Sequence, residues 1–344
     1  MRSRSIARFS PTGLLTLLLT SAIIGNTLAE PIAIAHRGAS GYLPEHTLPA
    51  KALAHAQGAH FIEQDVVLSK DGVPVVLHDI HLESTTNVAS MFPGRSRDDG
   101  HFYAIDFSLT ELKQLHAHER RNADGTAVFP NRFPLGPGLS QVPTLLEEIQ
   151  LIDGLNRTRD HKAGLYIELK GFAFHKAEGQ DLAATVLNVL DATGWADRSD
   201  AVYLQSFEPD ALRYLRSGLG TQLPLIQLIG ENDWAEDGEV DFTAMRSEEG
   251  LAAVAEYAQG IGPWVMQLYL GRESTGGYRL SDLARRAHEH GLLVHPFTLR
   301  ADQLPPGLKD FQELHQVLFD RIGVDGVFTD FPDQTIAFLQ RKRQ

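Results

Sequence analysis

The most informative part of the sequence begins with HRGASGYLPEHT at residues 36–47 and continues with FIEQDVVLSKDGVPVVLHD at residues 61–79. It places His36 and Arg37 directly after one short apolar run, and His78 directly after another. Each of these polar residues lies where a strand would pass into a loop, which is where α/β folds carry their chemistry. The stretch therefore predicts strands with a functional site at their ends.

Two acidic residues share one face of the predicted strand over residues 61–68. Glu63 and Asp65 are two positions apart, so both side chains project to the same side while Gln64 points away. Neighbouring carboxylates repel, and they stay ionised together only if a cation or a strong donor lies between them. A hard divalent metal ion is the simplest such cation. Together with two histidines and an arginine, the pair suits cleavage of an anionic ester.

The rest of the chain alternates short apolar runs with amphipathic segments, and no linker or low-complexity tract interrupts them. Capping boxes predict helix starts at Ser108 and Thr144, the second for a helix over residues 145–153, and Ser281 with Asp282 predicts a helix over 283–290. The alternation favours an α/β fold, a (β/α)8 TIM barrel, over an open doubly wound sheet. The predicted strands cover residues 32–35, 61–68, 73–77, 164–169, 201–205, 223–228, 265–268, 292–296 and 326–328.

One connection is too long for a simple strand–helix–strand unit. About ninety residues separate His78 from Glu168, whereas a helix and its loops need about thirty. The surplus, roughly residues 80–143, predicts a small insertion subdomain. A long excursion with only a structural role is the alternative.

The N-terminus has the pattern of a signal peptide. Arg2, Arg4 and Arg8 precede an apolar run over residues 13–24, and small residues follow up to Ala29. We expect cleavage after about Ala29 and a periplasmic protein, with an uncleaved anchor as the alternative. The chain has no cysteine, which excludes a lipoprotein anchor.

The charge balance limits the partners that the chain can bind. Removal of residues 1–29 takes away three arginines and no acid, so the formal charge falls from −13 to −16. So acidic a body repels nucleic acid and anionic membranes. We therefore expect no nucleic-acid partner and no stable membrane association, and an anionic substrate has to meet local cations. Monomer and homodimer both remain open.

The motifs quoted above, with YIELK at residues 166–170, VYLQSF at 202–207, VHPFT at 294–298 and DGVFTDFPD at 325–333, resemble the glycerophosphodiester phosphodiesterase family, and its bacterial periplasmic members most of all. The resemblance covers essentially the whole chain after the signal peptide. It implies a TIM barrel whose insertion packs over the site-bearing end. It also implies hydrolysis of small glycerophosphodiesters to sn-glycerol 3-phosphate and an alcohol, in glycerol and phospholipid degradation.

The resemblance assigns roles residue by residue. Glu63, Asp65 and Glu168 match the family's metal ligands, an all-oxygen set for which we expect Ca²⁺ rather than Mg²⁺. His36 and His78 match its acid/base pair, although which is acid and which is base stays open. The nucleophile is either a glycerol hydroxyl or water. The predicted substrate-binding residues are Arg37, Lys170, Glu45, Gln205, Phe207 and Phe297.

Several assignments have structural alternatives. Glu168 could pair with Lys170 without a ligand, and the aromatic side chains, with Phe328, could belong to a packed barrel rim. We expect Glu45 and His46 to lie behind the residues that line the site, where Glu45 could orient Arg37 and His46 could begin the following helix. We interpret His46 and His295 as structural.

Two other functions also fit the shared motifs. One is a phospholipase D-like lyase that acts on intact lipid, and the other is a binding barrel without catalysis. The lyase predicts an exposed apolar loop, and the sequence shows none clearly. The binding barrel is weakened because the polar site residues are all chemically competent.

Overall fold

Eight parallel strands form the centre of the protein. The structure is a computed structural model, and it describes residues 30–136, 138–234 and 240–343; the predicted signal peptide lies outside these residues. The hydrogen-bonded order is β10-β7-β6-β5-β4-β2-β1-β11. The eight strands are β1 (Ile32–Ala35), β2 (Phe61–Leu68), β4 (Gly164–Leu169), β5 (Val202–Ser206), β6 (Leu225–Ile229), β7 (Gly260–Pro263), β10 (Leu293–Val294) and β11 (Gly326–Thr329).

The two outer strands of that order also meet. The Phe328 N–H donates to the Pro296 carbonyl at 3.0 Å, and the Leu299 N–H donates to the Phe328 carbonyl at 2.8 Å. These bonds bring the chain after β10 against β11 and almost close the sheet on itself. The predicted (β/α)8 barrel is confirmed, and the open doubly wound sheet is not formed.

Helices follow the strands and bury their apolar faces against the outside of the barrel. The capping boxes predicted at Ser108 and Thr144 are both present. The helix that begins after Thr144 continues to Thr158, beyond its predicted end. The helices are α1 (Leu48–Ala56), α4 (Leu145–Thr158), α5 (Phe172–Ala177), α6 (Leu182–Thr193), α7 (Pro209–Arg213), α8 (Phe242–Met245), α9 (Glu248–Ala255), α10 (Leu283–Glu289), α11 (Phe311–Gln316) and α12 (Pro332–Lys342).

The barrel interior has an apolar layer below a polar one. Phe61 precedes Glu63 and Asp65 on the inner face of β2, and Tyr166 precedes Glu168 on that of β4. The apolar layer packs through Ile34, Phe61, Tyr166, Ile226 and Phe328. Side chains that alternate along a strand therefore fill the barrel near its amino end and place the acids near its carboxyl end.

His295 belongs to the apolar layer. Its Nδ1 atom lies 2.9 Å from the Tyr166 hydroxyl, and burial lowers its pKa to about 4. The buried ring has a hydrogen-bond partner inside the barrel, in agreement with the structural interpretation of this residue.

Two of the predicted strands are wrong as barrel strands. Residues 73–77 contribute β3 (Pro74–Val76), which pairs antiparallel with β2, because the turn at Gly72 is too short for a parallel crossover. Residues 265–267 form a 3₁₀ turn instead of a strand, and β7 lies just before them. In β7 a Cβ atom at Gly262 would lie 2.6 Å from Leu228, so close packing requires a glycine-rich strand without an apolar run.

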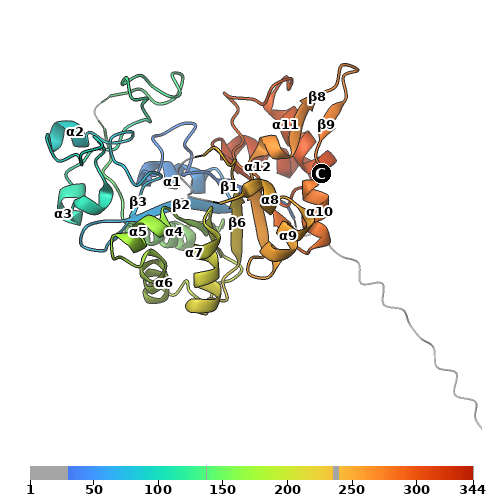
Figure 1. Ribbon diagram of the computed structural model, residues 1–344. Helices are drawn as coiled ribbons and strands as arrows, with labels where there is room; N and C mark the ends of the chain where they lie inside the picture. Colours follow the sequence, from blue (N-terminus) through green and yellow to red (C-terminus); the bar gives the residue numbers. More distant parts are fainter. Residues whose placement is uncertain (1–29, 137, 235–239, 344) are drawn as a thin grey trace, which may run out of the picture. The chain divides into compact units, whose positions relative to one another are not determined.

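Residues 80–143 have a small apolar core of their own. They contain α2 (Val88–Met91), a 3₁₀ turn (Ala104–Asp106) and α3 (Leu109–Leu112). Their core joins Val67 of β2 and Val75 of β3. We call residues 80–143 the excursion. The hairpin of β8 (Tyr269–Arg272) and β9 (Tyr278–Leu280) is a second, smaller addition to the barrel (Figure 1).

Candidate active site

A pocket of about 500 Å³ opens at the carboxyl ends of the barrel strands. Most of the predicted site residues line it. Glu45 and Asp65 do not line it but contact Arg37, which does. The predicted residues in the lining are His36, Arg37, Glu63, His78, Glu168, Lys170, Gln205, Phe207 and Phe297.

Three buried carboxylates meet at the base of the pocket. The register between β2 and β4 pairs Asp65 with Glu168, and Glu63 lies two positions earlier on the same face of β2. Oxygen atoms of Glu63, Asp65 and Glu168 all lie within 4.8 Å of one another. Burial and the two neighbouring carboxylates raise the pKa of Glu63 well above its usual value. The carboxylates of the cluster therefore repel one another, and a bound cation would offset this repulsion.

The donor atoms of this cluster fit a divalent cation. All three residues are at most 5% exposed. Asp65 Oδ1 is buried and has no hydrogen-bond partner among the described residues. A buried carboxylate oxygen without a partner is destabilising, and a bound cation would remove that cost. Because all of its donor atoms are oxygens, the cluster can hold a hard ion.

Glu63 is fixed by a backbone donor and an amide. The Arg37 N–H donates to Glu63 Oε2 at 2.8 Å, and Gln205 Nε2 donates to Oε1 at 3.0 Å. Arg37 adopts a left-handed backbone with φ of 57°, which is uncommon for a residue other than glycine. Its guanidinium donates to both oxygens of Glu45 at 3.0 Å. Glu45 thus orients Arg37 from outside the pocket.

Asp65 is oriented by His46, which was expected behind the residues that line the site. His46 Nε2 lies 2.8 Å from Asp65 Oδ2. Thr47, and not His46, caps α1. Behind the ring, Lys51 Nζ donates to His46 Nδ1 at 3.1 Å and lies 3.2 Å from Glu148. Lys51 and Glu148 are completely buried.

This contact chain sets the protonation of its members. Because Lys51 donates to Nδ1, His46 carries its proton on Nε2 and donates to Asp65. Burial and Lys51 lower the pKa of His46 to about 4, so the ring is neutral. Although burial opposes it, the His46 contact holds the pKa of Asp65 well below its usual value. The sequence did not reveal this series of contacts, because Glu148 lies about a hundred residues away from Lys51.

The two predicted acid/base histidines have the same arrangement. His36 Nδ1 lies 2.6 Å from Asp330 Oδ1, and His78 Nδ1 bonds Asp79. Burial and then Arg37 lower the pKa of His36 to about 4 and that of His78 to about 3. Each ring is therefore neutral with its proton on Nδ1 and a lone pair on Nε2.

Arginines that were not predicted hold the partners of these histidines. Asp330 accepts from Arg132 at 2.7 Å and from Arg300 at 2.9 Å. Asp79 accepts from Arg120 at 2.7 Å, and Arg120 also donates to Glu45. Arg120 and Arg132 belong to the excursion, which therefore reaches the site-bearing end of the barrel. Asp330 lies in the DGVFTDFPD motif, but the sequence did not predict it as a site residue.

The remaining lining is one cation and an aromatic wall. Lys170 Nζ lies 3.0 Å from Glu168 Oε1 and 5.5 Å from the centre of the Phe207 ring. The rings of Phe207 and Phe297 pack edge to face, with 5.6 Å between their centres. Trp234 and Trp264, which were not predicted, extend this wall, and Phe328 also lines the pocket. The tryptophans lie in loops without a recognisable motif.

A barrel that carries buried carboxylates, two carboxylate-backed histidines and cations around one pocket defines a hydrolase of anionic phosphate esters. Residues 36–334 match the model of the glycerophosphoryl diester phosphodiesterase family, and the chain belongs to that family.

Curated relatives are similar to this chain in sequence over nearly their full length. The glycerophosphodiester phosphodiesterase of Haemophilus influenzae is 40% identical, covering 91% of this chain and 90% of the relative. That of Treponema pallidum is 37% identical, covering 93% and 94%. The protein is therefore a phosphoric diester hydrolase.

Solved structures have the same fold. A glycerophosphoryl diester phosphodiesterase from Silicibacter pomeroyi superposes with a TM-score of 0.67 at 24% identity, covering 91% of this chain and 94% of that chain. An Oleispira antarctica phosphodiesterase, solved in complex with the product sn-glycerol-3-phosphate, gives a TM-score of 0.61 at 25% identity, covering 90% and 97%.

Proposed function

We propose that this protein hydrolyses small glycerophosphodiesters to sn-glycerol 3-phosphate and an alcohol, in a reaction that depends on a divalent metal ion. The observation that carries the proposal is a pocket lined by two histidines, His36 and His78, and by two members, Glu63 and Glu168, of a cluster of three buried carboxylates. The product bound to the Oleispira relative supports the assignment of the product.

Glu63, Asp65 and Glu168 would hold the metal ion. Their donor set is oxygen only, which suits Ca²⁺ or Mg²⁺ and is poorly suited to softer metals. We favour Ca²⁺, because the proposed periplasmic location makes calcium available. When bound, such an ion supplies Lewis-acid catalysis and a template for the phosphate.

The histidines would move the protons. Each Nε2 lone pair can accept the proton of an attacking hydroxyl, while the Nδ1–H stays bound to its carboxylate, Asp330 or Asp79. A histidine that has taken up a proton can return it to the departing alkoxide. His36 Nε2 lies 3.9 Å from Glu63 and 3.5 Å from the Thr298 hydroxyl, so its reactive nitrogen faces the acid cluster.

Arg37 and Lys170 would bind the phosphate oxygens. Arg37 is held by Glu45 and presents a planar fork, and Lys170 offers a compact charge for the transition state. The aromatic wall of Phe207 and Phe297 would contact the glycerol carbons. The pocket thus has a polar side for phosphate and an apolar side for carbon.

A direct assay tests the proposal. We expect the purified protein to release sn-glycerol 3-phosphate from glycerophosphocholine and glycerophosphoethanolamine, to lose this activity in EDTA, and to regain it with Ca²⁺ or Mg²⁺. Asp65→Ala should abolish both the turnover and the thermal stabilisation by the metal, since an ion that binds only the native state raises its stability. Full activity in excess chelator would contradict the metal dependence.

The export proposal has its own test. Cell fractionation of the untagged protein should place it in the periplasm, shortened at about Ala29. A full-length protein in the cytoplasmic fraction would overturn this part of the proposal and leave the chemistry unaffected.

A further inference from the structure

A second group of metal-type ligands lies in the excursion, outside the pocket. Residues 81–83 and 101–103 run antiparallel: His81 pairs with Tyr103, and the Leu82 N–H donates to the Phe102 carbonyl at 2.9 Å. Leu82 and Phe102 are buried in the core of the excursion. Because side chains alternate along such a ladder, the residues on either side of them share the opposite face.

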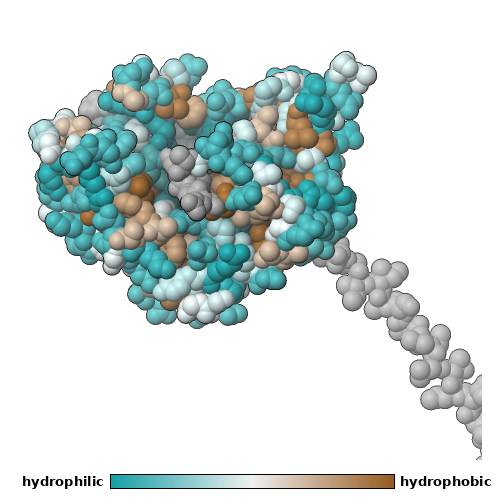
Figure 2. Space-filling model, in the orientation of Figure 1, coloured by the Kyte–Doolittle hydropathy of each residue, from teal (hydrophilic) through white to brown (hydrophobic). Residues whose placement is uncertain are grey.

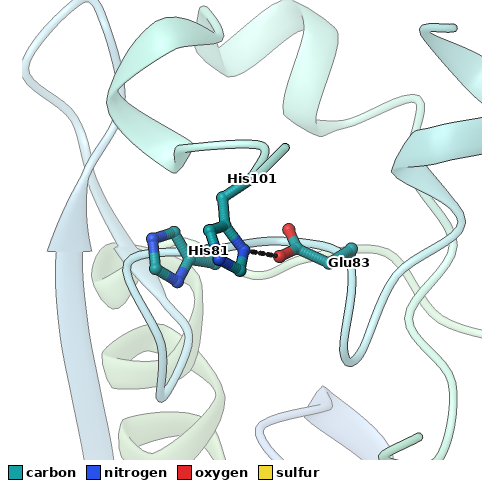
Figure 3. A group of neighbouring side chains, drawn as sticks. All are labelled: His81, Glu83 and His101. Atoms are coloured by element: carbon teal, nitrogen blue, oxygen red, sulfur yellow. Dashed lines mark hydrogen bonds and ion pairs between the residues drawn. The ribbon is translucent and has the colours of Figure 1, made fainter. Parts of the chain in front are cut away.

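Three ligand side chains meet on that opposite face (Figure 3). Glu83 is opposite His101 across the ladder, and His81 lies two positions before Glu83. One ligand atom from each of the three lies within 4.8 Å of the others. His101 Nδ1 and Glu83 Oε1 are 2.5 Å apart.

We propose that His81, Glu83 and His101 form a binding site for a divalent transition-metal ion of the Zn²⁺ type. Two imidazole nitrogens and one carboxylate oxygen are a donor set that suits Zn²⁺ and leaves a coordination position for water. The acid cluster of the pocket has only oxygen donors and suits hard ions. The two sites therefore select different metals.

The state of His81 supports the assignment. Its Nε2 atom is buried and has no hydrogen-bond partner among the described residues. The ring stacks on His101, with 4.3 Å between ring centres and 17° between planes. A ring nitrogen binds a metal in the plane of its ring, so one of the two stacked rings has to rotate about its Cβ–Cγ bond before both can bind the same ion.

An ion can reach the site from solvent, since the side chains of His101 and Glu83 are 49% and 31% exposed. Once bound, it would clamp the two segments of the ladder together. The first segment follows Asp79, the partner of His78, by only two residues. The ion would thus stabilise the part of the excursion that begins next to the pocket, while the proposed reaction needs a metal ion only at the acid cluster.

Calorimetric titration with Zn²⁺ tests the site. The protein is first saturated with Ca²⁺, so that the acid cluster is occupied. We expect His101→Ala and Glu83→Gln each to weaken one Zn²⁺ equivalent by at least about tenfold. His116→Ala is the matched control, because His116 is an exposed histidine of the same excursion outside the cluster. It should bind Zn²⁺ like the unaltered protein.

Two further readouts make the outcome decisive. Zn²⁺ should raise the melting temperature of the unaltered protein and of His116→Ala but not of His101→Ala, and Co²⁺ should give visible absorption bands that Glu83→Gln weakens. Equal Zn²⁺ affinity in all three variants would overturn the proposal, as would loss of the Zn²⁺ stabilisation in Asp65→Ala alone. If His101→Ala does not fold, Glu83→Gln decides by itself. Failure here leaves the proposed hydrolysis untouched, because that depends on other residues.

Discussion

Lys51 is the buried residue on which the orientation of Asp65 depends. It contacts His46 and Glu148, and its ammonium group also donates to the Glu63 carbonyl. We expect Lys51→Met to weaken Ca²⁺ binding roughly tenfold or more, because His46 loses the donor that fixes its tautomer. It should also lower the free energy of unfolding by about 3 kcal/mol, since Glu148 is left unpaired in the interior.

A double variant separates these two effects. Lys51→Met with Glu148→Gln removes the unpaired carboxylate, so stability should return while the Ca²⁺ affinity stays low. Isothermal titration measures the affinity and chemical denaturation the stability. Lys70→Met, at an exposed lysine, is the matched control. Normal Ca²⁺ affinity in the double variant would show that Lys51 only stabilises the fold.

The two carboxylate-backed histidines allow a second prediction at the residue scale. His36→Ala and His78→Ala should each lower kcat about 100-fold or more, because each removes an Nε2 atom that is argued to move a proton. Neither residue belongs to the acid cluster, so Ca²⁺ affinity should change far less. His290→Ala, outside the pocket, is the control. A variant with near-normal kcat would return its histidine to a structural role.

Most of these residues could be predicted because they lie in motifs at strand ends, as His36, Glu63 and Lys170 do. Their partners could not. Arg120, Arg132 and Glu148 act through contacts between segments far apart in the sequence, and no local pattern marks an arginine as the partner of a distant carboxylate. His46 was expected to begin the following helix, but Thr47 beside it caps that helix, and the contact of His46 with Asp65 was not predicted.

At the scale of elements, Asp330 joins parts that are distant in the chain. It follows β11 and contacts His36 after β1, Arg132 of the excursion and Arg300. Despite its burial, Arg300 and His36 hold its pKa well below the usual value. The ionised form is thus favoured in the folded state. The stabilisation that comes from ionised Asp330 is complete above the pKa of its carboxyl in the unfolded protein, about 4. It is lost as the pH falls through the pKa of the carboxyl in the folded protein.

Asp330→Asn tests this linkage. We expect the variant to be less stable than the unaltered protein by about 3 kcal/mol near pH 7, because its arginine partners lose a buried charge. The difference should shrink as the pH approaches about 3. Urea denaturation at several pH values measures it, with the exposed Asp98→Asn as control. A difference that does not depend on pH would contradict the ionised pairing.

The predicted boundaries of the strands agree with the structure where an apolar run coincides with a buried strand. β1, β2 and β4 have the predicted limits. β7 did not, because Gly260 and Gly262 are required by close contacts with neighbouring strands, so the strand carries little apolar pattern. β3 was misassigned because an apolar run does not reveal whether its pairing is parallel or antiparallel.

The molecule as a whole carries a negative charge. The formal charge is −13 for the full sequence. Figure 2 shows a face that is largely hydrophilic, with apolar side chains in several smaller groups. Among the described residues, no helix is long and apolar enough to cross a membrane. The large apolar side chains that stand exposed there come from separate places in the chain: Met91, Leu139, Leu146 and Leu270.

These features lead to a prediction on substrate choice. An acidic surface is repelled by anionic bilayers, whereas the pocket is lined by the cations Arg37, Lys170 and Arg300. In the proposed function, Arg37, Lys170 and the metal ion would bind the phosphate and the aromatic wall would bind the glycerol, so the enzyme should discriminate little among the alcohols on the far side of the phosphate. We expect similar kcat/KM for the choline, ethanolamine and glycerol diesters, measured by release of sn-glycerol 3-phosphate. Bis(p-nitrophenyl) phosphate, which lacks glycerol, should be a poor substrate, as should vesicles of intact phosphatidylcholine. Faster cleavage of the vesicles than of glycerophosphocholine would instead favour a lipase-like enzyme on the same barrel.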